Sequence, residues 1–183
     1  MNDPVKRVAN ALLNRVHSSR PPLLIDLRFP IQTQLQLYAD QRTHSGYGGG
    51  IFPYLGRPPA NIDFAQMACE PPAPHMRFYH PRLPWYIDLM SASYMQRLTV
   101  WEVIEGVWRE LQKPITSRDF YNEEMGTTAR DLVTIAFRSR CKATGETSKG
   151  VRRVDWLGMD GEWIWTGIVR NRSGMWEIKT RKI

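Results

Sequence analysis

The feature that most constrains the fold is a strongly amphipathic helix, which the apolar pattern predicts over residues 99–112. Its apolar residues recur at the i, i+3, i+4, i+7 spacing of one buried helix face: Val100, Val103, Ile104, Val107, Trp108 and Leu111. Thr99 and Glu102 have the spacing of a capping box, and Pro114 ends the helix because the residue before a proline avoids the helical region. Gly106 costs such a helix about 1 kcal/mol relative to alanine, so we expect a neighbouring element to approach closely there.

Two strands are predicted directly before this helix. The first covers residues 76–80, and its alternation places three side chains on one face: Met76, Phe78 and His80. The second covers residues 85–90, which are nearly all apolar apart from Asp88, so we expect it to be covered on both faces. The order strand, strand, helix resembles the opening of a β-grasp domain.

The C-terminal part is predicted to contain a further helix and three strands. The helix covers residues 127–142 and is capped by Thr128 with Asp131. Three strand-like segments follow, separated by glycine-containing turns, and predict an antiparallel meander: residues 151–157, 162–169 and 175–180. The predicted fold class is therefore α+β, with a single domain over residues 21–183. Its mixed or mainly antiparallel sheet (hairpin plus C-terminal meander) is packed by two or three helices.

Residues 1–20 are predicted to form an N-terminal amphipathic helix and a linker. Asp3 and Pro4 have the residue types of a helix start, and an apolar stripe continues over residues 3–17. We interpret this segment as a helix that docks on the domain or on a second copy, which would give a homo-oligomer. A mitochondrial presequence and a membrane-surface helix are the alternatives.

A glycine-rich loop is predicted at residues 45–56. It is not a phosphate-binding P-loop, because Ile51 and Phe52 stand where that motif needs a lysine followed by a serine or threonine. The loop is interpreted as a surface insertion, and a mobile loop that folds over a partner is the alternative.

The net charge and the cysteine content indicate which partners and which cellular compartment to expect. The 183 residues carry a net charge of +7, and residues 126–183 hold 12 basic and six acidic side chains. This balance permits nucleic acid or another polyanion as a partner. Cys69 and Cys141 are expected to be free thiols, since no secretory segment and no apolar run of roughly 20 residues is found. The expected location is intracellular, cytoplasmic or nuclear, with the mitochondrion as a minor alternative.

The sequence contains no local catalytic or metal-binding motif. The four histidines lack zinc-ligand spacing, so neither a metal nor a cofactor is predicted. A pairing of Cys69 or Cys141 with a histidine stays open, but neither cysteine lies at a nucleophile elbow. Three aspartates fall in predicted strands and are interpreted as ion-pair partners of arginines such as Arg28 and Arg153, rather than as acid–base catalysts: Asp26, Asp88 and Asp155.

The strongest candidate for a site is a basic cluster where the second helix ends. Its anion-binding candidates are Arg138, Arg140, Lys142, Lys149, Arg152 and Arg153. The expected aromatic contacts beside it are Trp156, Trp163 and Trp165. The alternative is a solvated basic surface whose cations offset the helix dipole.

Several short motifs point to one family. They include Asp26-Leu27-Arg28, Leu83-Pro84-Trp85, Leu111 to Thr116, Arg140-Cys141, Gly150 to Leu157 and Trp176. With this order, residues 22–180 resemble short proteins of mushroom-forming (basidiomycete) fungi that are known only as a domain of unknown function. The resemblance implies a fungal source and a recurrent α+β domain, and it implies no activity.

We therefore expect a non-enzymatic binding or protein-interaction module with a basic C-terminal surface. Its partner would be a protein or a polyanion such as nucleic acid. The alternative is a small intracellular hydrolase or transferase whose active site is covered by the glycine-rich loop.

Overall fold

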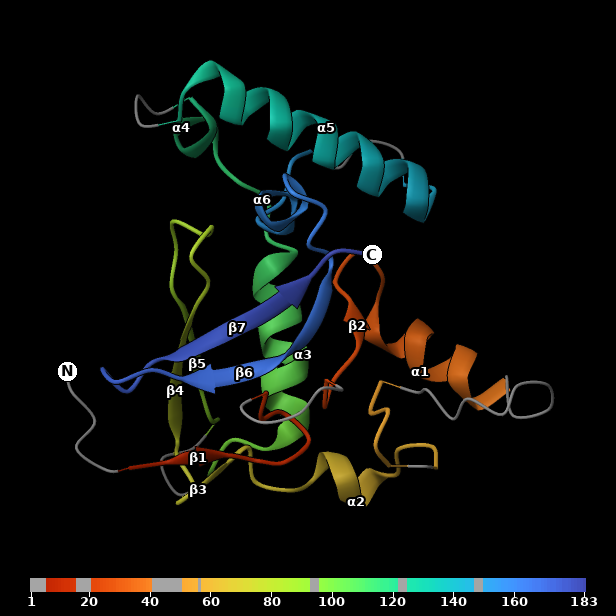
Figure 1. The fold of residues 1–183 in the computed structure, drawn as a ribbon, viewed down its shortest axis with the longest axis vertical. Helices are drawn as coiled ribbons and strands as arrows, with labels where there is room; N and C mark the ends of the chain where they lie inside the picture. The colour runs from red at the N-terminus through yellow and green to blue at the C-terminus, as the bar shows by residue number, and fades with distance from the viewer. Residues whose placement is uncertain are drawn as a thin grey trace.

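The computed structural model describes residues 6–15, 21–40, 51–55, 57–92, 96–121, 125–146 and 150–183. Its centre is a five-stranded sheet with strand order β2-β6-β7-β4-β5 (Figure 1). β4 runs parallel to β7, whereas the other neighbouring strands are antiparallel. The strands are β2 (Ile25–Asp26), β4 (His75–Tyr79), β5 (Ile87–Met90), β6 (Ile164–Arg170) and β7 (Trp176–Arg181). This mixed sheet, packed by several helices in one domain, confirms the predicted α+β class.

The predicted amphipathic helix is α3 (Val100–Leu111), which packs against the sheet (Figure 1). Its capping box is present, since Thr99 Oγ1 accepts from the Glu102 N–H at 3.2 Å and Glu102 Oε2 accepts from the Thr99 N–H at 2.8 Å. The close approach at Gly106 is also confirmed. A Cβ there would lie 2.9 Å from both methyl carbons of Leu89, so the missing side chain lets β5 pack directly on the helix.

The predicted order of strand, strand and helix is present. The antiparallel hairpin β4–β5 leads into α3, and the later strand β7 returns beside β4 in the parallel direction. A parallel neighbour requires a long crossover, and α3 with the helices after it supplies that connection. The buried face of β4 is the predicted one, with Met76, Phe78 and His80 all less than 7% exposed.

The remaining helices form two groups. α1 (Ile31–Asp40) and α2 (Asn61–Phe64) lie beside the sheet, whereas α4 (Ser117–Phe120), α5 (Thr127–Thr144) and α6 (Val154–Gly158) lie together at one end (Figure 1). The second group has a small core of its own around Met125, Val133 and Trp156. α5 begins after Gly126, so the predicted cap at Thr128 is wrong. No helix among the described ranges is long and apolar enough to cross a membrane.

The predicted C-terminal meander is wrong in its first strand. Residues 154–158 form helix α6, and only β6 and β7 remain as a hairpin. The cause is burial of consecutive residues, since Val154 to Leu157 are all less than 7% exposed. A strand with one covered face would bury alternate residues, whereas a short helix wedged between α5 and the sheet buries neighbours.

The predicted N-terminal helix is also wrong over its described part, residues 6–15. β1 (Val8–Ala9) pairs with β3 (Cys69–Glu70), and Leu13 is fully buried in the main core. The Ile168 N–H donates to the Leu13 carbonyl at 2.7 Å, which attaches this segment to β6. The apolar residues are thus buried by strand pairing and turns, and these residues offer no helix for a homo-oligomer.

The predictions for β5 and for the glycine-rich loop also differ from the structure or are described only in part. β5 is an edge strand with Asp88 and Met90 exposed, so it is not covered on both faces as predicted. Asp88 forms an ion pair with Arg77 on the exposed face, and this pair and the surrounding solvent stabilise its charge. Most of the predicted glycine-rich loop at 45–56 lies outside the described residues. In its described part, Ile51 and Phe52 are buried in the main core.

Candidate functional site

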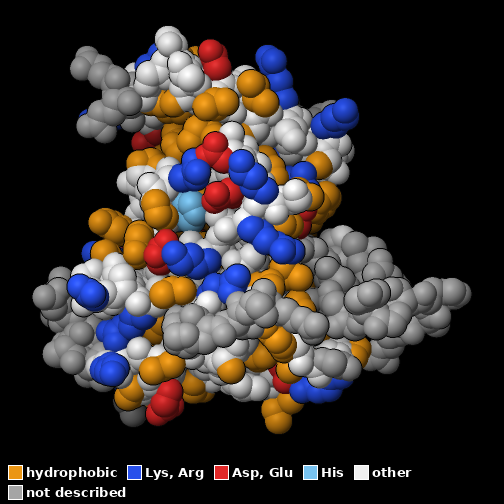
Figure 2. All heavy atoms as spheres, in the orientation of Figure 1, with side chains coloured by type: hydrophobic (Ala, Val, Ile, Leu, Met, Phe, Trp, Pro, Cys, Tyr) orange, Lys and Arg blue, Asp and Glu red, His pale blue; other side chains and the backbone are white. Residues whose placement is uncertain are grey.

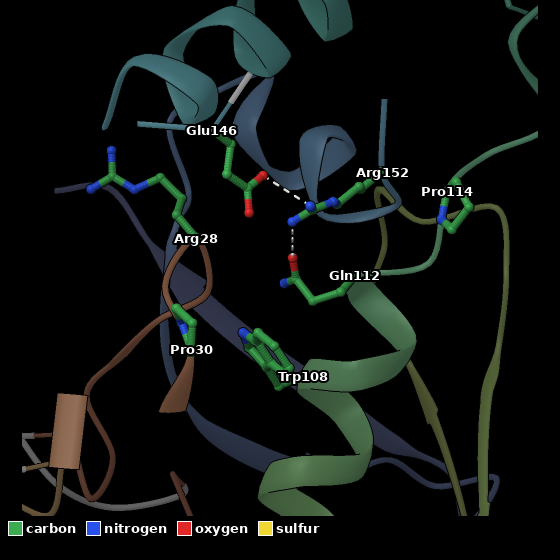
Figure 3. Close-up of a pocket in the computed structure, with 7 residues that line it drawn as sticks. All are labelled: Arg28, Pro30, Trp108, Gln112, Pro114, Glu146 and Arg152. Atoms are coloured by element: carbon green, nitrogen blue, oxygen red, sulfur yellow. Dashed lines mark hydrogen bonds and ion pairs between the residues drawn. The ribbon is translucent and has the colours of Figure 1, made fainter. Parts of the chain in front are cut away.

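A pocket of about 460 Å³ lies where the C-terminal end of α3 meets the segment after β2 and the segment between α5 and α6 (Figure 3). Pockets of about 300–1,000 Å³ are typical of small-ligand sites. The lining side chains come from these three separate parts of the chain: Arg28, Pro30, Trp108, Gln112, Pro114, Glu146 and Arg152. Folding alone brings these residues together.

The last turns of α3 supply the floor of the pocket. Trp108 and Gln112 lie four residues apart and therefore share one helix face. The Trp108 ring lines the pocket, and its indole nitrogen is buried with no hydrogen-bond partner in the described structure. Figure 3 shows this nitrogen at the end of the ring that faces Pro30. A buried N–H without a partner costs about 1–3 kcal/mol, so this donor is an unusual feature of the site.

Gln112 is held rigidly on both sides of its amide. Its Nε2 donates to the Leu27 carbonyl at 2.9 Å, and its Oε1 accepts from Arg152 Nη1 at 3.0 Å. These two bonds also fix the orientation of the amide, since oxygen and nitrogen each meet a partner of the correct kind.

Glu146 joins two arginines above the pocket. Its Oε2 accepts from Arg152 at 2.8 Å and from Arg140 at 3.0 Å. Arg140 is fully buried and also forms a two-point ion pair with Asp155, at 2.8 and 3.0 Å. Burial opposes the charge on Arg140, but the hydrogen bonds and charge of Asp155 outweigh it and raise the pKa of Arg140. The network holds the end of α5 against α6.

Arg28 closes the opposite side of the pocket. Its Nη2 is 2.6 Å from Asp26 Oδ2, and its Nε donates to Asp26 Oδ1 at 2.9 Å. This pair was predicted from the sequence. Asp155 also has an arginine partner, as predicted, but the partner is Arg140. Arg153, which was named as a candidate partner of these aspartates, pairs with Glu110 at 3.2 Å instead.

The structure divides the predicted basic cluster. Arg138 and Lys142 are exposed on α5, Arg140 is buried, Arg152 lines the pocket, and Arg153 lies over the Trp85 ring at 5.1 Å. Lys149 lies outside the described residues. The three tryptophans expected beside the cluster are buried in the two cores, none more than 6% exposed: Trp156, Trp163 and Trp165.

Sequence reasoning missed three residues that build the pocket. Trp108 was assigned to the buried stripe of α3, Gln112 was noted only as part of the family motif Leu111 to Thr116, and Glu146 lies in no motif. Gln112 lies 40 positions from the arginine to which it is hydrogen-bonded. The one signal in the sequence was indirect: a buried arginine needs a carboxylate partner, so Arg140 and Arg152 required acidic residues nearby.

The candidate nucleophiles and bases are not brought together. Cys69 is buried with its Sγ 3.4 Å from the Pro71 carbonyl, whereas His75 is an exposed residue at the start of β4, 2.9 Å from Asp88. Among the described residues, no group of three or more metal-ligating side chains was found.

His80 is held neutral in a separate hydrogen-bonded chain. The Arg82 N–H donates to His80 Nδ1 at 3.2 Å, so His80 Nε2 carries the hydrogen and donates to Thr180 Oγ1 at 3.0 Å. Thr180 in turn donates to Glu162 at 2.7 Å. Burial lowers the pKa of His80 from 6.5 to about 4. Because both ring nitrogens are occupied, His80 is a structural residue here.

We expect His80 to make the fold less stable in acid. The unfolded state binds a proton near pH 6.5 and the folded state only near pH 4, so the stabilisation is complete above pH 6.5 and is lost as the pH falls towards 4. The loss should reach about 3 kcal/mol, and it is measured by urea unfolding at pH 7, 5.5 and 4.5. His80→Gln should flatten this dependence, with His75→Gln as the exposed control. An unchanged slope in His80→Gln would contradict the assignment.

Comparison with known proteins gives a family but no activity. The model of a family of unknown function, DUF6699, matches residues 23–174. This range includes four of the five strands of the main sheet, most of the main core, the whole smaller core and every residue that lines the pocket. No curated protein and no solved structure matches the chain. The chain therefore belongs to DUF6699, a family whose function is unknown.

Proposed function

We propose that the chain is a non-enzymatic binding module whose ligand occupies the pocket beside Trp108. The observation that carries this proposal is a pocket of about 460 Å³, which is lined by the Trp108 ring and by polar groups that are already fixed. Gln112, Arg152 and Glu146 are held by ion pairs and hydrogen bonds. A ligand would therefore meet a prearranged site, and little ordering entropy would be lost on binding.

The lining residues favour binding over catalysis. They include no histidine, cysteine or serine, and the one carboxylate, Glu146, has an oxygen shared by two guanidinium groups. A hydrolase or transferase needs a nucleophile with a base in hydrogen-bond reach. The enzyme alternative relied on the loop at 45–56, of which residues 51–55 alone are described, and it has no support from the pocket.

The polyanion version of the proposal has weaker support. Among the described members of the predicted cluster, Arg140, Arg152 and Arg153 are paired with carboxylates, whereas Arg138 and Lys142 are exposed. Figure 2 shows basic and acidic side chains intermixed over the centre of the face in view, without a continuous basic area. A small ligand or a segment of a partner protein fits this surface better than a nucleic-acid strand.

Titration with single-stranded RNA or DNA at several salt concentrations tests this preference. If Arg138 and Lys142, the exposed cations among the described members of the cluster, make the phosphate contacts, the slope of log K against log salt should be about −1.4, since each phosphate contact on a single strand contributes about −0.7. Arg138→Glu with Lys142→Glu should remove this weak binding. A slope steeper than about −3 would require four or more phosphate contacts and would restore the polyanion interpretation.

A fragment screen observed by ¹⁵N NMR tests the proposed pocket. The chain has seven tryptophans, so seven indole N–H signals are expected, and Trp108→Phe identifies the one of interest. Fragments that bind should shift the Trp108 indole signal and the side-chain amide signals of Gln112. Trp101, on α3 but packed edge-on against Phe64, is the matched control. Fragments that shift other regions alone, or no binding at all, would contradict the proposal.

We also propose an intracellular location, in the cytoplasm or nucleus, and a basidiomycete source. The free thiols of Cys69 and Cys141 support a reducing compartment. The fungal source has the sequence resemblance as its support. Imaging of a C-terminal fluorescent fusion in a fungal host tests the compartment, and mitochondrial or secreted fluorescence would contradict it.

A further inference from the structure

We propose that the chain forms a weak symmetric dimer in which β5 of one copy pairs antiparallel with β5 of a second copy. The interaction surface is the free edge of the sheet, and the partner that fits it is the same strand. No residue that lines the pocket lies in β5, so this inference goes beyond the proposed binding function and is independent of it.

β5 is the open edge of the five-stranded sheet. It pairs with β4 on one side, and no strand among the described residues pairs with its other side. Figure 1 shows the β4–β5 hairpin on the left of the sheet. The opposite edge is β2, which has only the two residues Ile25 and Asp26, and a very short edge strand is a poor template for another chain. A further strand would therefore add to β5 rather than to β2.

The backbone of β5 has hydrogen-bonding groups that point away from the sheet. The Ser91 N–H donates to the Pro74 carbonyl at 2.8 Å, which makes these two residues a hydrogen-bonded pair of the ladder between β4 and β5. Bonded and non-bonded pairs alternate in an antiparallel ladder, so Asp88 and Met90 belong to non-bonded pairs. Their N–H and C=O groups therefore face outward, where another strand can bond to them.

The side chains on the exposed face of this edge suit a second copy. Tyr86, directly before β5, and Met90, at its end, are 57% and 66% exposed, and Asp88 lies midway between them. An antiparallel pairing with its two-fold axis at Asp88 places Tyr86 of each copy opposite Met90 of the other. Directly opposed side chains have Cβ atoms about 4.5–5.5 Å apart, so each exposed apolar residue is covered by an apolar residue of the other copy.

β5 lacks the features that usually keep an edge strand from pairing. It contains no proline and no lysine, and its register with β4 is regular over all four residue pairs. Its one charge, on Asp88, is balanced by Arg77, whose Nε and Nη2 donate at 2.7 and 2.9 Å, and His75 contacts the same carboxylate at 2.9 Å. Two opposed aspartates weaken the pairing, but they do not prevent it, because each has its own arginine.

The assembly closes with two copies. A two-fold axis makes the contact surface the same on both copies, so the edge is fully occupied once the dimer has formed. The paired strands are short, and interfaces that bury less than about 1,200 Å² are weak and transient. We therefore expect a monomer at about 10 µM, a substantial share of dimer at about 1 mM, and no larger assembly.

Sedimentation equilibrium of the full chain over this concentration range measures the dimer, and NMR identifies the contact. Within one copy, Tyr86 and Met90 are four residues apart along an extended chain, which is about 13 Å and beyond the range of an NOE. An NOE between the Met90 methyl group and the Tyr86 ring, in a mixture of differently labelled copies, would therefore show the paired strands. A chain that stays monomeric at about 1 mM, or a dimer without this NOE, would overturn the proposal.

Two variants test the edge directly. Met90→Pro removes the outward N–H without removing a bond to β4, and Met90→Lys places a charge against Tyr86 of the other copy. Each substitution acts twice in a symmetric dimer, so each should weaken association by at least about tenfold. Ile135→Lys on α5, where Ile135 is 60% exposed, is the matched control and should leave the dimer unchanged. If Met90→Pro fails to fold, Met90→Lys carries the test, and unchanged association in the folded Met90 variants would overturn the proposal.

Discussion

Replacing Arg140 with methionine is expected to destabilise the fold by about 3–5 kcal/mol, because it leaves the Asp155 carboxylate buried without its ionic partner. Both side chains are fully buried, and two hydrogen bonds of 2.8 and 3.0 Å join them. Asp155 keeps one bond, from the Arg152 N–H at 2.8 Å, which does not neutralise its charge. Unfolding in urea, followed by circular dichroism, gives the change in free energy.

Two controls separate the buried pair from other effects. Arg138→Met lies on the same helix, is exposed, and should change stability by less than about 0.5 kcal/mol. The double change Arg140→Met with Asp155→Leu removes both charges and should recover much of the loss, since apolar replacement of a buried pair is often close to neutral. A single Arg140→Met variant as stable as the native chain would show that Asp155 does not need this partner.

The central elements could be predicted because their signals are local. The period and capping box of α3, the alternation of β4 and the turn before β7 each lie within about one element, and the structure contains all three. The predictions for residues 6–15 (a helix) and 154–158 (a strand) were wrong for the same reason. Their apolar spacing shows how much surface is buried, but long-range partners such as Ile168 and α5 decide the backbone conformation.

The pocket could be predicted only in part. Asp26 and Arg28 are only two residues apart in the sequence, so their pairing could be predicted from it. The network of Arg140, Glu146 and Arg152 was not, because a run of basic residues says nothing about the carboxylates that fold against it. The basic patch expected from composition is consequently, in large part, a set of internal ion pairs.

Replacing Gly167 with alanine is expected to lower the free energy of unfolding by about 3–5 kcal/mol, because the added Cβ would both strain the backbone and collide with a neighbouring atom. The φ angle of Gly167 is +132°, a conformation that other residues rarely adopt. An added Cβ would also lie 2.6 Å from the Leu13 carbonyl oxygen. That oxygen accepts the 2.7 Å bond from the Ile168 N–H, so residues 13–15 would have to move away from β6. Urea unfolding measures the loss.

Gly161→Ala separates the two causes. Gly161 also has a positive φ, +75°, but nothing lies within 4 Å of an added Cβ. This variant should therefore lose about 1 kcal/mol of stability, from backbone strain alone. The difference between the two variants contains the contact with Leu13 together with the additional backbone strain at the φ of Gly167. Faster hydrogen exchange at Ile168 in Gly167→Ala alone would locate the damage at the attachment of the N-terminal segment. Equal losses of stability in both variants would mean that residues 13–15 move away from β6 at little cost and do little to stabilise the sheet.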